Sequence, residues 1–309
     1  QACNQASSCL AMNLIKFRKF AYALSFLLVA ASIALLLTFG LKLGIDFTGG
    51  SILEVEYTAP RPQISAIEEK VSALGFGHVL IQPTGERGVI LRARDLSEEE
   101  HQRLLAEISS QGSLQELRFD SIGPTIGREL QDRAAWATLL VLAMIILYVA
   151  WAFRHVSRPI SSWMYGVFAV VALFHDILIP AGLFAFLGKY YGVEIDTLFV
   201  TAILTVLGFS VHDTIVVFDR VRENLKKQIK GEVFEEIVGR SLGETLTRSI
   251  NTSLTVLIVL LALYFLGSES TKYFSLTLIV GIIAGTYSSI FIASPLLVTW
   301  HNFRQKRAR

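Results

Sequence analysis

Six long apolar segments constrain this chain more than any other feature of its sequence. A helix needs about 20 apolar residues to cross the hydrocarbon core of a bilayer. Windows of this kind lie at 20–39, 134–153, 163–187, 197–217, 249–267 and 273–298. Hydrophobic residues make up 52% of the 309 residues and charged residues only 17%, and the mean hydropathy is +0.52. The sequence therefore predicts an α-helical membrane protein with six transmembrane helices.

The basic residues are divided unequally between the two sides of these spans. Lys and Arg gather in the N-terminal segment 1–19, the loop 154–162, the loop 218–248 and the tail 299–309. The short loops on the other side carry only Lys189 and Lys272. Because cytoplasmic loops carry an excess of Lys and Arg, we expect both termini in the cytoplasm of a bacterial inner membrane. The long segment 40–133 is then a periplasmic domain.

The first residues of the chain have a separate interpretation. Residues 1–11 precede Met12, a plausible natural start, and hold both cysteines, Cys3 and Cys9, which do not indicate a disulfide framework. The basic stretch before residue 20 is also typical of a signal peptide. The segment 20–39 contains twenty uncharged residues, however, and no small-residue cleavage site follows it. An uncleaved membrane anchor is therefore the better interpretation.

The periplasmic segment alternates between strand and helix patterns. The patterns are, in order, a strand at 51–57, a helix at 64–74, a hairpin of strands at 78–82 and 89–94, a helix that Ser97 and Glu100 open with a capping box, and a strand at 114–119. The order βαββαβ predicts a ferredoxin-like domain between spans 1 and 2. It contains no group of His, Cys or paired carboxylates at catalytic or ligand spacing, so we expect a binding or conformational element with no catalytic residues and no metal.

Polar residues inside the spans are few, and each one is a functional hypothesis because a polar group in a bilayer is unfavourable. Ser210, Asp213 and Thr214 share one face of the fourth span, and His212 lies beside them. His175 and Asp176 lie near the middle of the third span.

The fifth span opens with a cation and a polar face. Arg248 is followed at helical spacing by Thr252 and Thr255, and Asn251 adds a further polar group. A carboxylate in a low-dielectric medium resists ionisation unless a cation or a donor is close. The approach and retreat of Arg248 could therefore switch Asp213 between neutral and charged forms, which is the chemistry of a proton-driven machine.

Asp213, Arg248 and Asp176 are accordingly the predicted proton-transfer residues. The alternative for either aspartate is a static hydrogen-bonding role, and Arg248 could instead extend to the membrane interface. For His175 and His212, a role as packing donors is favoured over a role as proton relays.

Glycines carry two further predictions. Gly281 and Gly285 give the sixth span a small-residue face for close helix packing, which Ser288 and Ser289 continue. The turn motif after the first span contains Asp46, Gly49 and Gly50, and its two glycines predict a tight turn with positive φ.

Several of these segments resemble the signature motifs of the bacterial SecF family, within the resistance-nodulation-division superfamily. The motifs are Gly44-Ile-Asp-Phe-Thr-Gly-Gly50, Phe174-His-Asp-Ile177, the run from Gly208 to Asn224, and Arg248-Ser-Ile-Asn-Thr-Ser253. The resemblance runs from about Met12 to the C-terminal tail. Residues 1–11 depart from it, which leaves open whether the chain was cut from a longer product such as a fused SecD–SecF polypeptide.

The resemblance implies an accessory role in protein export. It implies a SecD partner, association with YajC, and work beside the SecYEG channel and SecA on a translocating unfolded polypeptide. It also implies that Asp213 carries the proton and that Arg248 is its charge partner. The expected coupling ion is H+, with no other cofactor and no nucleic-acid partner.

Three other functions compete with this one. Half of a proton-driven small-molecule exporter of the same superfamily would use the same carboxylate chemistry, but such pumps normally carry twelve spans and two large external domains. An intramembrane aspartyl protease needs Gly-x-Gly-Asp, whereas Ser-Val-His precedes Asp213. A purely structural scaffold would leave Asp213 and Arg248 unexplained.

Overall fold

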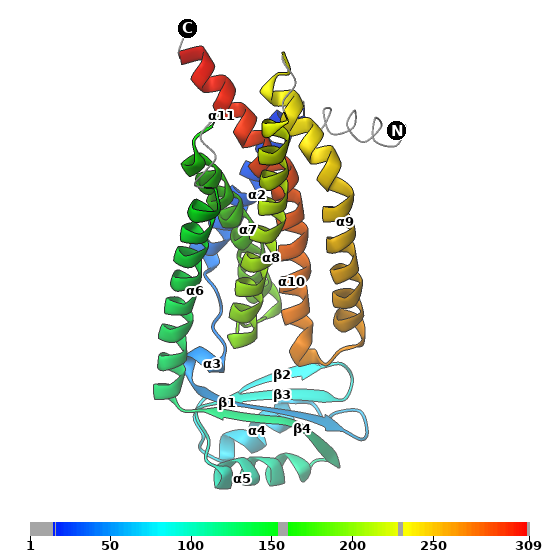
Figure 1. The fold of residues 1–309 in the computed structure, drawn as a ribbon. Helices are drawn as coiled ribbons and strands as arrows, with labels where there is room; N and C mark the ends of the chain where they lie inside the picture. Colours follow the sequence, from blue (N-terminus) through cyan, green and yellow to red (C-terminus); the bar gives the residue numbers. More distant parts are fainter. Residues whose placement is uncertain (1–14, 16, 154–159, 228–230, 308–309) are drawn as a thin grey trace. The chain divides into compact units, whose positions relative to one another are not determined.

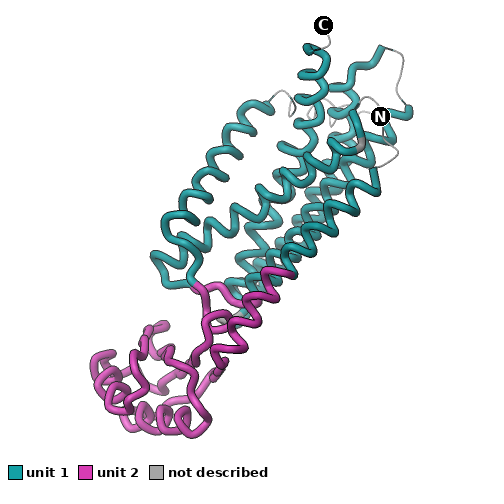
Figure 2. The backbone as a smooth tube through the Cα atoms, turned by 90° about the vertical axis from the view of Figure 1, so that its left-hand side faces the viewer, with its two compact units in different colours: residues 1–42, 137–193, 198–309 teal, residues 43–136, 194–197 magenta. Residues whose placement is uncertain are grey.

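The computed structural model describes residues 15, 17–153, 160–227 and 231–307. It divides into two compact units, shown in Figure 2. Unit 1 comprises residues 1–42, 137–193 and 198–309, and unit 2 comprises residues 43–136 and 194–197. The predictions for residues 1–14 and for residues 154–159 of the loop predicted at 154–162 lie outside the described residues.

Unit 2 contains one four-stranded antiparallel sheet in the order β2-β3-β1-β4. The strands are β1 (Gly50–Tyr57), β2 (Leu80–Thr84), β3 (Gly88–Ala93) and β4 (Leu114–Ile122), and the helices are α3 (Ile45–Thr48), α4 (Ile64–Ala73) and α5 (Glu98–Ser109). Helices α4 and α5 cover one face of the sheet (Figure 1). The predicted βαββαβ domain is confirmed.

Local sequence signals explain this domain. Alternate residues of β1, Leu53, Val55 and Tyr57, are buried against the helices, as the period of two requires. Ser97 accepts a hydrogen bond from the N–H of Glu100, whose carboxylate accepts one from the N–H of Ser97. This capping box satisfies two donors at the start of α5 and fixes where that helix begins.

Six helical segments of the described chain are long and apolar enough to span a membrane, and they belong to unit 1 except for residues 124–136 of α6 and the first residue of α8. They are α2 (Arg18–Phe39), α6 (Pro124–Ala152), α7 (Ser162–Tyr191), α8 (Thr197–Lys226), α9 (Phe234–Leu266), and a continuous last segment made of α10 (Glu269–Ser288), the π-helical turn η1 (Ser289–Ala293) and α11 (Ser294–Arg307). The chain is therefore a multi-pass membrane protein, as predicted.

The fourth and fifth helices are longer than the sequence predicted. We expected a loop over 218–248, but α8 continues to Lys226 and α9 already begins at Phe234. The apolar windows end where charged residues begin, although the inward apolar faces continue past them. Phe218 and Val221 remain buried on α8, and Leu242 remains buried on α9. Apolar contacts therefore hold both helices together beyond the spans.

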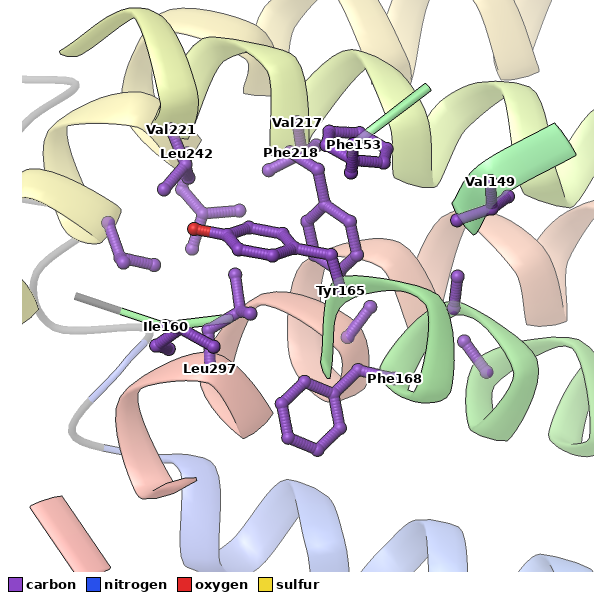
Figure 3. Close-up of a cluster of buried hydrophobic side chains, with 14 of the residues drawn as sticks. Val149, Phe153, Ile160, Tyr165, Phe168, Val217, Phe218, Val221, Leu242 and Leu297 are labelled. Carbon is purple, nitrogen blue, oxygen red and sulfur yellow. The ribbon is translucent and has the colours of Figure 1, made fainter. Parts of the chain in front are cut away.

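An aromatic cluster lies beside the parts of α8 and α9 that continue beyond the apolar windows. The ring of Tyr165 is fully buried, stacks on Phe153 at a centroid distance of 5.5 Å, and meets Phe218 edge-on at 5.3 Å. Val221, Leu242 and Leu297 lie around it, so α7, α8, α9 and α11 share one core (Figure 3). This core positions the helices that carry the polar residues of the spans.

Candidate functional site

Two aspartates are buried among the apolar helices of unit 1. Asp176 lies on α7 with a fully buried side chain, and Asp213 lies on α8 with 7% of its surface exposed. An ionised carboxylate in such surroundings is very unfavourable unless hydrogen-bond donors or cations compensate it. The partners of these two carboxylates therefore decide what the site can do.

Asp213 is held by one serine on each of two other helices. Ser249 of α9 donates to Oδ1 over 2.5 Å, and Ser289 of η1 donates to Oδ2 over 2.7 Å. Both serines are themselves buried. Each carboxylate oxygen thus has a hydroxyl partner, and α8 is tied to α9 and to the last span at one side chain.

Asp176 has a similar set of partners. Its Oδ2 accepts hydrogen bonds from Ser210 of α8 and, over 2.7 Å, from Ser288 of α10. Its Oδ1 lies 2.8 Å from Nδ1 of His175, the preceding residue. Ser210 therefore supports Asp176. The sequence predicted it as a supporting polar group because it shares a helix face with Asp213.

The last span brings both aspartates together through two adjacent serines. Ser288 bonds to Asp176 and Ser289 bonds to Asp213, at the start of the π-helical turn. Ser294 donates to the carbonyl of Ser289, five residues back, over 2.9 Å. Single π-helical turns inside α-helices are frequent at functional sites.

Small residues allow the last span to lie close to α8. A Cβ atom on Gly285 would lie 3.0 Å from Cβ of Ser210, and one on Gly281 would lie 2.2 Å from Val206. The last span therefore packs on α8 along the face that carries these glycines, as a small-residue helix interface requires.

Two further predicted residues are buried next to the aspartates. Thr214 has a buried hydroxyl, and His175 has a buried Nε2, with no hydrogen-bond partner for either atom among the described residues. The imidazole of His175 stacks on Tyr287 at a centroid distance of 5.8 Å. His212, by contrast, is exposed on α8.

The predicted polar residues of α9 lie on its exposed face. Arg248, Asn251, Thr252 and Thr255 are all exposed in this single chain. Arg248 makes no ion pair with Asp213, and the neighbouring Ser249 contacts the carboxylate in its place. Successive helical residues differ by about 100° in direction, so only one of the two can face α8. The expected contact between Arg248 and Asp213 is absent from this conformation.

Both carboxylates are therefore surrounded by hydroxyl groups, with one imidazole beside Asp176. In the part of the chain that the structure describes, neither makes an ion pair with Lys or Arg, and no group of three His, Cys, Asp or Glu could hold a metal ion. A hydroxyl can donate to an ionised carboxylate and can accept from a protonated one. The site can thus accommodate both protonation states with the same residues.

The turn motif lies in unit 2 and has its own task. Oδ2 of Asp46 accepts from the N–H of Thr197 over 2.8 Å and from its hydroxyl over 2.6 Å, which caps the first residue of α8. Gly49 and Gly50 have φ values of 75° and 126°, positive as expected. A Cβ atom on Gly49 would lie 2.7 Å from Cα of Pro124, so the backbone passes too close for any side chain.

Sequence reasoning missed Ser249 altogether and assigned Ser288 and Ser289 only to helix packing. The available signal was weak. Serine is tolerated in apolar helices because its hydroxyl can bond to the carbonyl four residues back. A pair of adjacent serines in an apolar span was the one pattern that could have indicated a binding role.

Comparisons with known proteins agree with this architecture. Residues 102–303 match the family described as protein export membrane protein SecD/SecF, C-terminal, and residues 34–60 match the SecD/SecF GG motif. Protein translocase subunit SecF of Thermobaculum terrenum is 45% identical over 94% of both chains, and that of Anaerolinea thermophila is 39% identical over the same share of each chain.

A solved structure extends the match to the fold. The crystal structure of SecDF from Thermus thermophilus, a translocon-associated membrane protein, superposes with a TM-score of 0.81 at 34% identity. The match covers 94% of the present chain and 38% of the SecDF chain, so the chain spans less than half of that protein. Together, the six apolar helices, the ferredoxin-like domain and these similarities show that the chain belongs to the SecD/SecF family of protein export membrane proteins, with the SecF translocase subunits as its full-length relatives.

Proposed function

We propose that this chain works with SecD to couple the proton-motive force to the export of polypeptides across the inner membrane. The observation that carries the proposal is the pair of buried carboxylates on α7 and α8, which hydroxyl groups and one imidazole hold with no Lys or Arg partner among the described residues. A purely static role would favour a permanent countercharge or a neutral side chain at each position. In this proposal the chain is a proton-driven component and not an enzyme, H+ is the coupling ion, and no other cofactor takes part.

Arg248 keeps its proposed role as the charge partner of Asp213 in another state of the cycle. It precedes Ser249 in the chain and therefore belongs to the same turn of α9. Its long side chain can swing over a considerable distance. Its arrival would favour the ionised carboxylate, and its departure would leave Asp213 with hydroxyl partners only.

The exposed polar face of α9 supports a membrane-embedded partner. Arg248, Asn251 and Thr252 lie on this face within one turn of each other, in a helix long and apolar enough to span the bilayer. Polar groups that face lipid are unfavourable, so a protein surface is the expected cover. SecD is the proposed partner, and YajC, SecYEG with SecA, and the translocating polypeptide are the further partners that family membership suggests.

The proposed location is the inner membrane with both termini in the cytoplasm, because basic residues are concentrated beside those ends of the spans. A reporter fused after Arg309 should be active only in the cytoplasm. One inserted near Gly85 should be active only in the periplasm. The opposite pattern would contradict the orientation.

Reconstituted export tests the function directly. Vesicles that contain this chain with SecD, SecYEG and SecA are given a proton gradient or a sodium gradient of equal size, and the protected fraction of an exported polypeptide is measured. We expect stimulation by the proton gradient alone. Stimulation by sodium alone would reject H+ as the coupling ion. Gradient-driven efflux of small molecules without any effect on export would favour the exporter function.

A further inference from the structure

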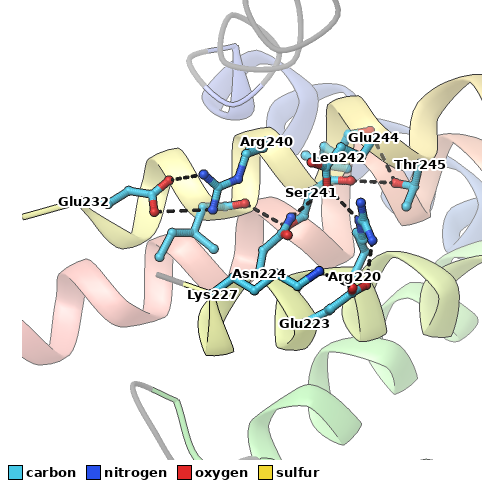
Figure 4. A network of polar contacts seen from close by, with 11 residues as sticks. Arg220, Glu223, Asn224, Lys227, Glu232, Arg240, Ser241, Leu242, Glu244 and Thr245 are labelled. Carbon is cyan, nitrogen blue, oxygen red and sulfur yellow. Dashed lines mark hydrogen bonds and ion pairs between the residues drawn. The ribbon is translucent and has the colours of Figure 1, made fainter. Parts of the chain in front are cut away.

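A second polar network joins α8 to α9 beyond Asp213, on the side of the loop between these helices (Figure 4). Oε2 of Glu244 accepts from Nε of Arg220 over 2.6 Å and from Nδ2 of Asn224 over 2.7 Å. Nδ2 of Asn224 also donates to the hydroxyl of Ser241 over 2.9 Å. We call these four residues the α8–α9 clamp.

The clamp is built to specify one relative position of the two helices. Asn224 and Ser241 are buried, so the amide protons of Asn224 depend on the oxygen atoms of α9. A buried donor that loses its acceptor is unfavourable, because water cannot replace the lost partner. Any slip of α9 along α8 would therefore separate Asn224 from both of its acceptors.

The clamp and the contact at Asp213 follow one another in the same antiparallel direction along the two helices. Moving back along α8 from Asn224 to Arg220 and then to Asp213 takes four and seven residues. Their partners on α9 are Ser241, Glu244 and Ser249, in that order. They are separated by three and five residues. At 1.5 Å per residue, Ser249 lies only about 7.5 Å beyond Glu244 along α9.

We infer that Glu244 is a positioning residue for the buried site, because it fixes α9 in the register that places the hydroxyl of Ser249 on Asp213. A shift of one residue along α9, about 1.5 Å and 100°, would move this hydroxyl off the carboxylate. The inference deepens the proposed function and rests on it for its effect on export. The geometric part stands on the structure of the helices alone.

Other charged pairs in the neighbourhood do not share this role. Glu223 pairs with Arg220 of α8 and with Lys227, the residue that follows α8. Glu232 pairs with Arg240, only eight residues further along the same segment. Glu232→Ala therefore removes an ion pair near the start of α9 without touching the clamp, and it serves as the matched control.

Disulfide trapping tests the geometry without any reference to protons. In a full-length chain whose Cys3 and Cys9 are replaced by Ala, Asp213→Cys and Ser249→Cys place two thiols where the structure has a direct side-chain contact. Oxidation should cross-link α8 to α9, because the two side chains point at each other. Cleavage between the helices followed by electrophoresis measures the cross-linked fraction.

The clamp variants are then added to this cysteine pair. Glu244→Ala should lower the cross-linking rate at least fivefold, whereas Glu244→Gln should retain it, because the amide oxygen of Gln can still accept from Asn224 and Arg220. Glu232→Ala should leave the rate unchanged. An unchanged rate in Glu244→Ala would overturn the inference. If the Ala variant does not accumulate in the membrane, Glu244→Asp, which keeps the charge but shortens the reach, replaces it.

Export measurements test the consequence in the intact complex. Glu244→Ala should reduce proton-stimulated export as far as Ser249→Ala does, and the double variant should be no worse than either, since one acts through the other. Glu244→Gln should keep export at the level of the unchanged protein, and so should Glu232→Ala. Additive losses would overturn the positioning role.

The two measurements separate the inference from the proposed function. If trapping depends on Glu244 but the Asp213→Asn variant still shows proton-stimulated export, the proposed function fails and the geometric inference stands. If Asp213→Asn abolishes stimulation but trapping ignores Glu244, the inference fails and the proposed function stands.

Discussion

Asp213→Asn is the sharpest test of the buried site, because the structure predicts how the amide is accommodated. The carboxylate accepts from Ser249 at Oδ1 and from Ser289 at Oδ2. Asn offers an acceptor oxygen and an NH2 group with two donor hydrogens in nearly the same volume. One serine can keep donating to the amide oxygen, and the other can rotate its hydroxyl to accept from the amide nitrogen. Neither serine is left without a partner.

The expected loss of stability is therefore small. Hydrogen bonds to a charged group contribute about 1.5–3 kcal/mol each, and neutral ones about 0.5–1.5 kcal/mol. Exchanging two bonds of the first kind for two of the second would cost about 2–3 kcal/mol. Removal of a buried charge offsets much of this, since desolvation of an ion opposes folding. We expect a net change of about 1 kcal/mol or less, and normal assembly with the partner.

The expected functional loss is complete, because Asn cannot bind or release a proton. Export into vesicles under a proton gradient should fall to the level that an uncoupler leaves in the unchanged protein. Asp219→Asn is the matched control: it changes the same residue type on the same helix, but Asp219 is exposed and pairs with Arg222 on α8 itself. This control should retain full stimulation.

Two results would refute the reasoning. Full gradient stimulation in Asp213→Asn would show that the carboxylate does not need to titrate. Loss of the Asp213→Asn protein from the membrane, with Asp219→Asn present in normal amount, would show that the charge has a structural role.

Three further predictions address other parts of the chain. Arg248→Met should abolish gradient stimulation as Asp213→Asn does. The variant with both changes should export no less than either single variant, and additive losses would contradict the pairing of Arg248 with Asp213. Gly49→Val should lower the amount of folded chain, measured by protease resistance in membranes. A Cβ would lie 2.7 Å from Cα of Pro124, and the φ of 75° disfavours a branched residue. An unchanged amount of folded chain would contradict the tight turn. Hydrogen bonds from Arg94, and secondarily from the N–H of Ser97, lower the pKa of Glu100 from 4.5 to about 2. The ionised carboxylate of Glu100 therefore stabilises α5 above about pH 4.5, and this stabilisation is lost as the pH falls toward 2. The protection factors of the amides at the start of α5, which correct for the intrinsic pH dependence of exchange, should fall over this range, and the Glu100→Gln variant should lack this fall.

The parts of the fold that the sequence predicted are those with local signals. The alternation in β1 and the capping box of Ser97 and Glu100 depend on residues within a few positions of each other, so they can be recognised without knowing the tertiary structure. The six spans depend on composition over about 20 residues, which is also local. The motif with Gly49 and Gly50 predicted its own positive φ for the same reason.

The partners of Asp213 could not be predicted in this way. Whether Ser249 or Arg248 faces α8 depends on the rotation of α9 about its axis, which distant packing decides. The π-helical turn at Ser289 inserts one residue into a helix without changing the hydropathy pattern, so the sequence carries no sign of it. The length of α8 was underestimated because a hydropathy window reports average polarity, whereas burial of Phe218 and Val221 depends on one face only.

The clamp also bears on how Arg248 could reach Asp213. If α9 rotated by about 100° to bring Arg248 to the position of Ser249, Glu244 and Ser241 would rotate with it and abandon Asn224, a buried donor. A swing of the Arg248 side chain leaves the clamp intact and requires only that its long apolar stem follow the surface of α9. In the proposed cycle, the helices would therefore keep their register and the cation would move. In such a cycle Ser249 stays on the carboxylate throughout, and the arrival of Arg248 adds a charge to the hydroxyl group already present.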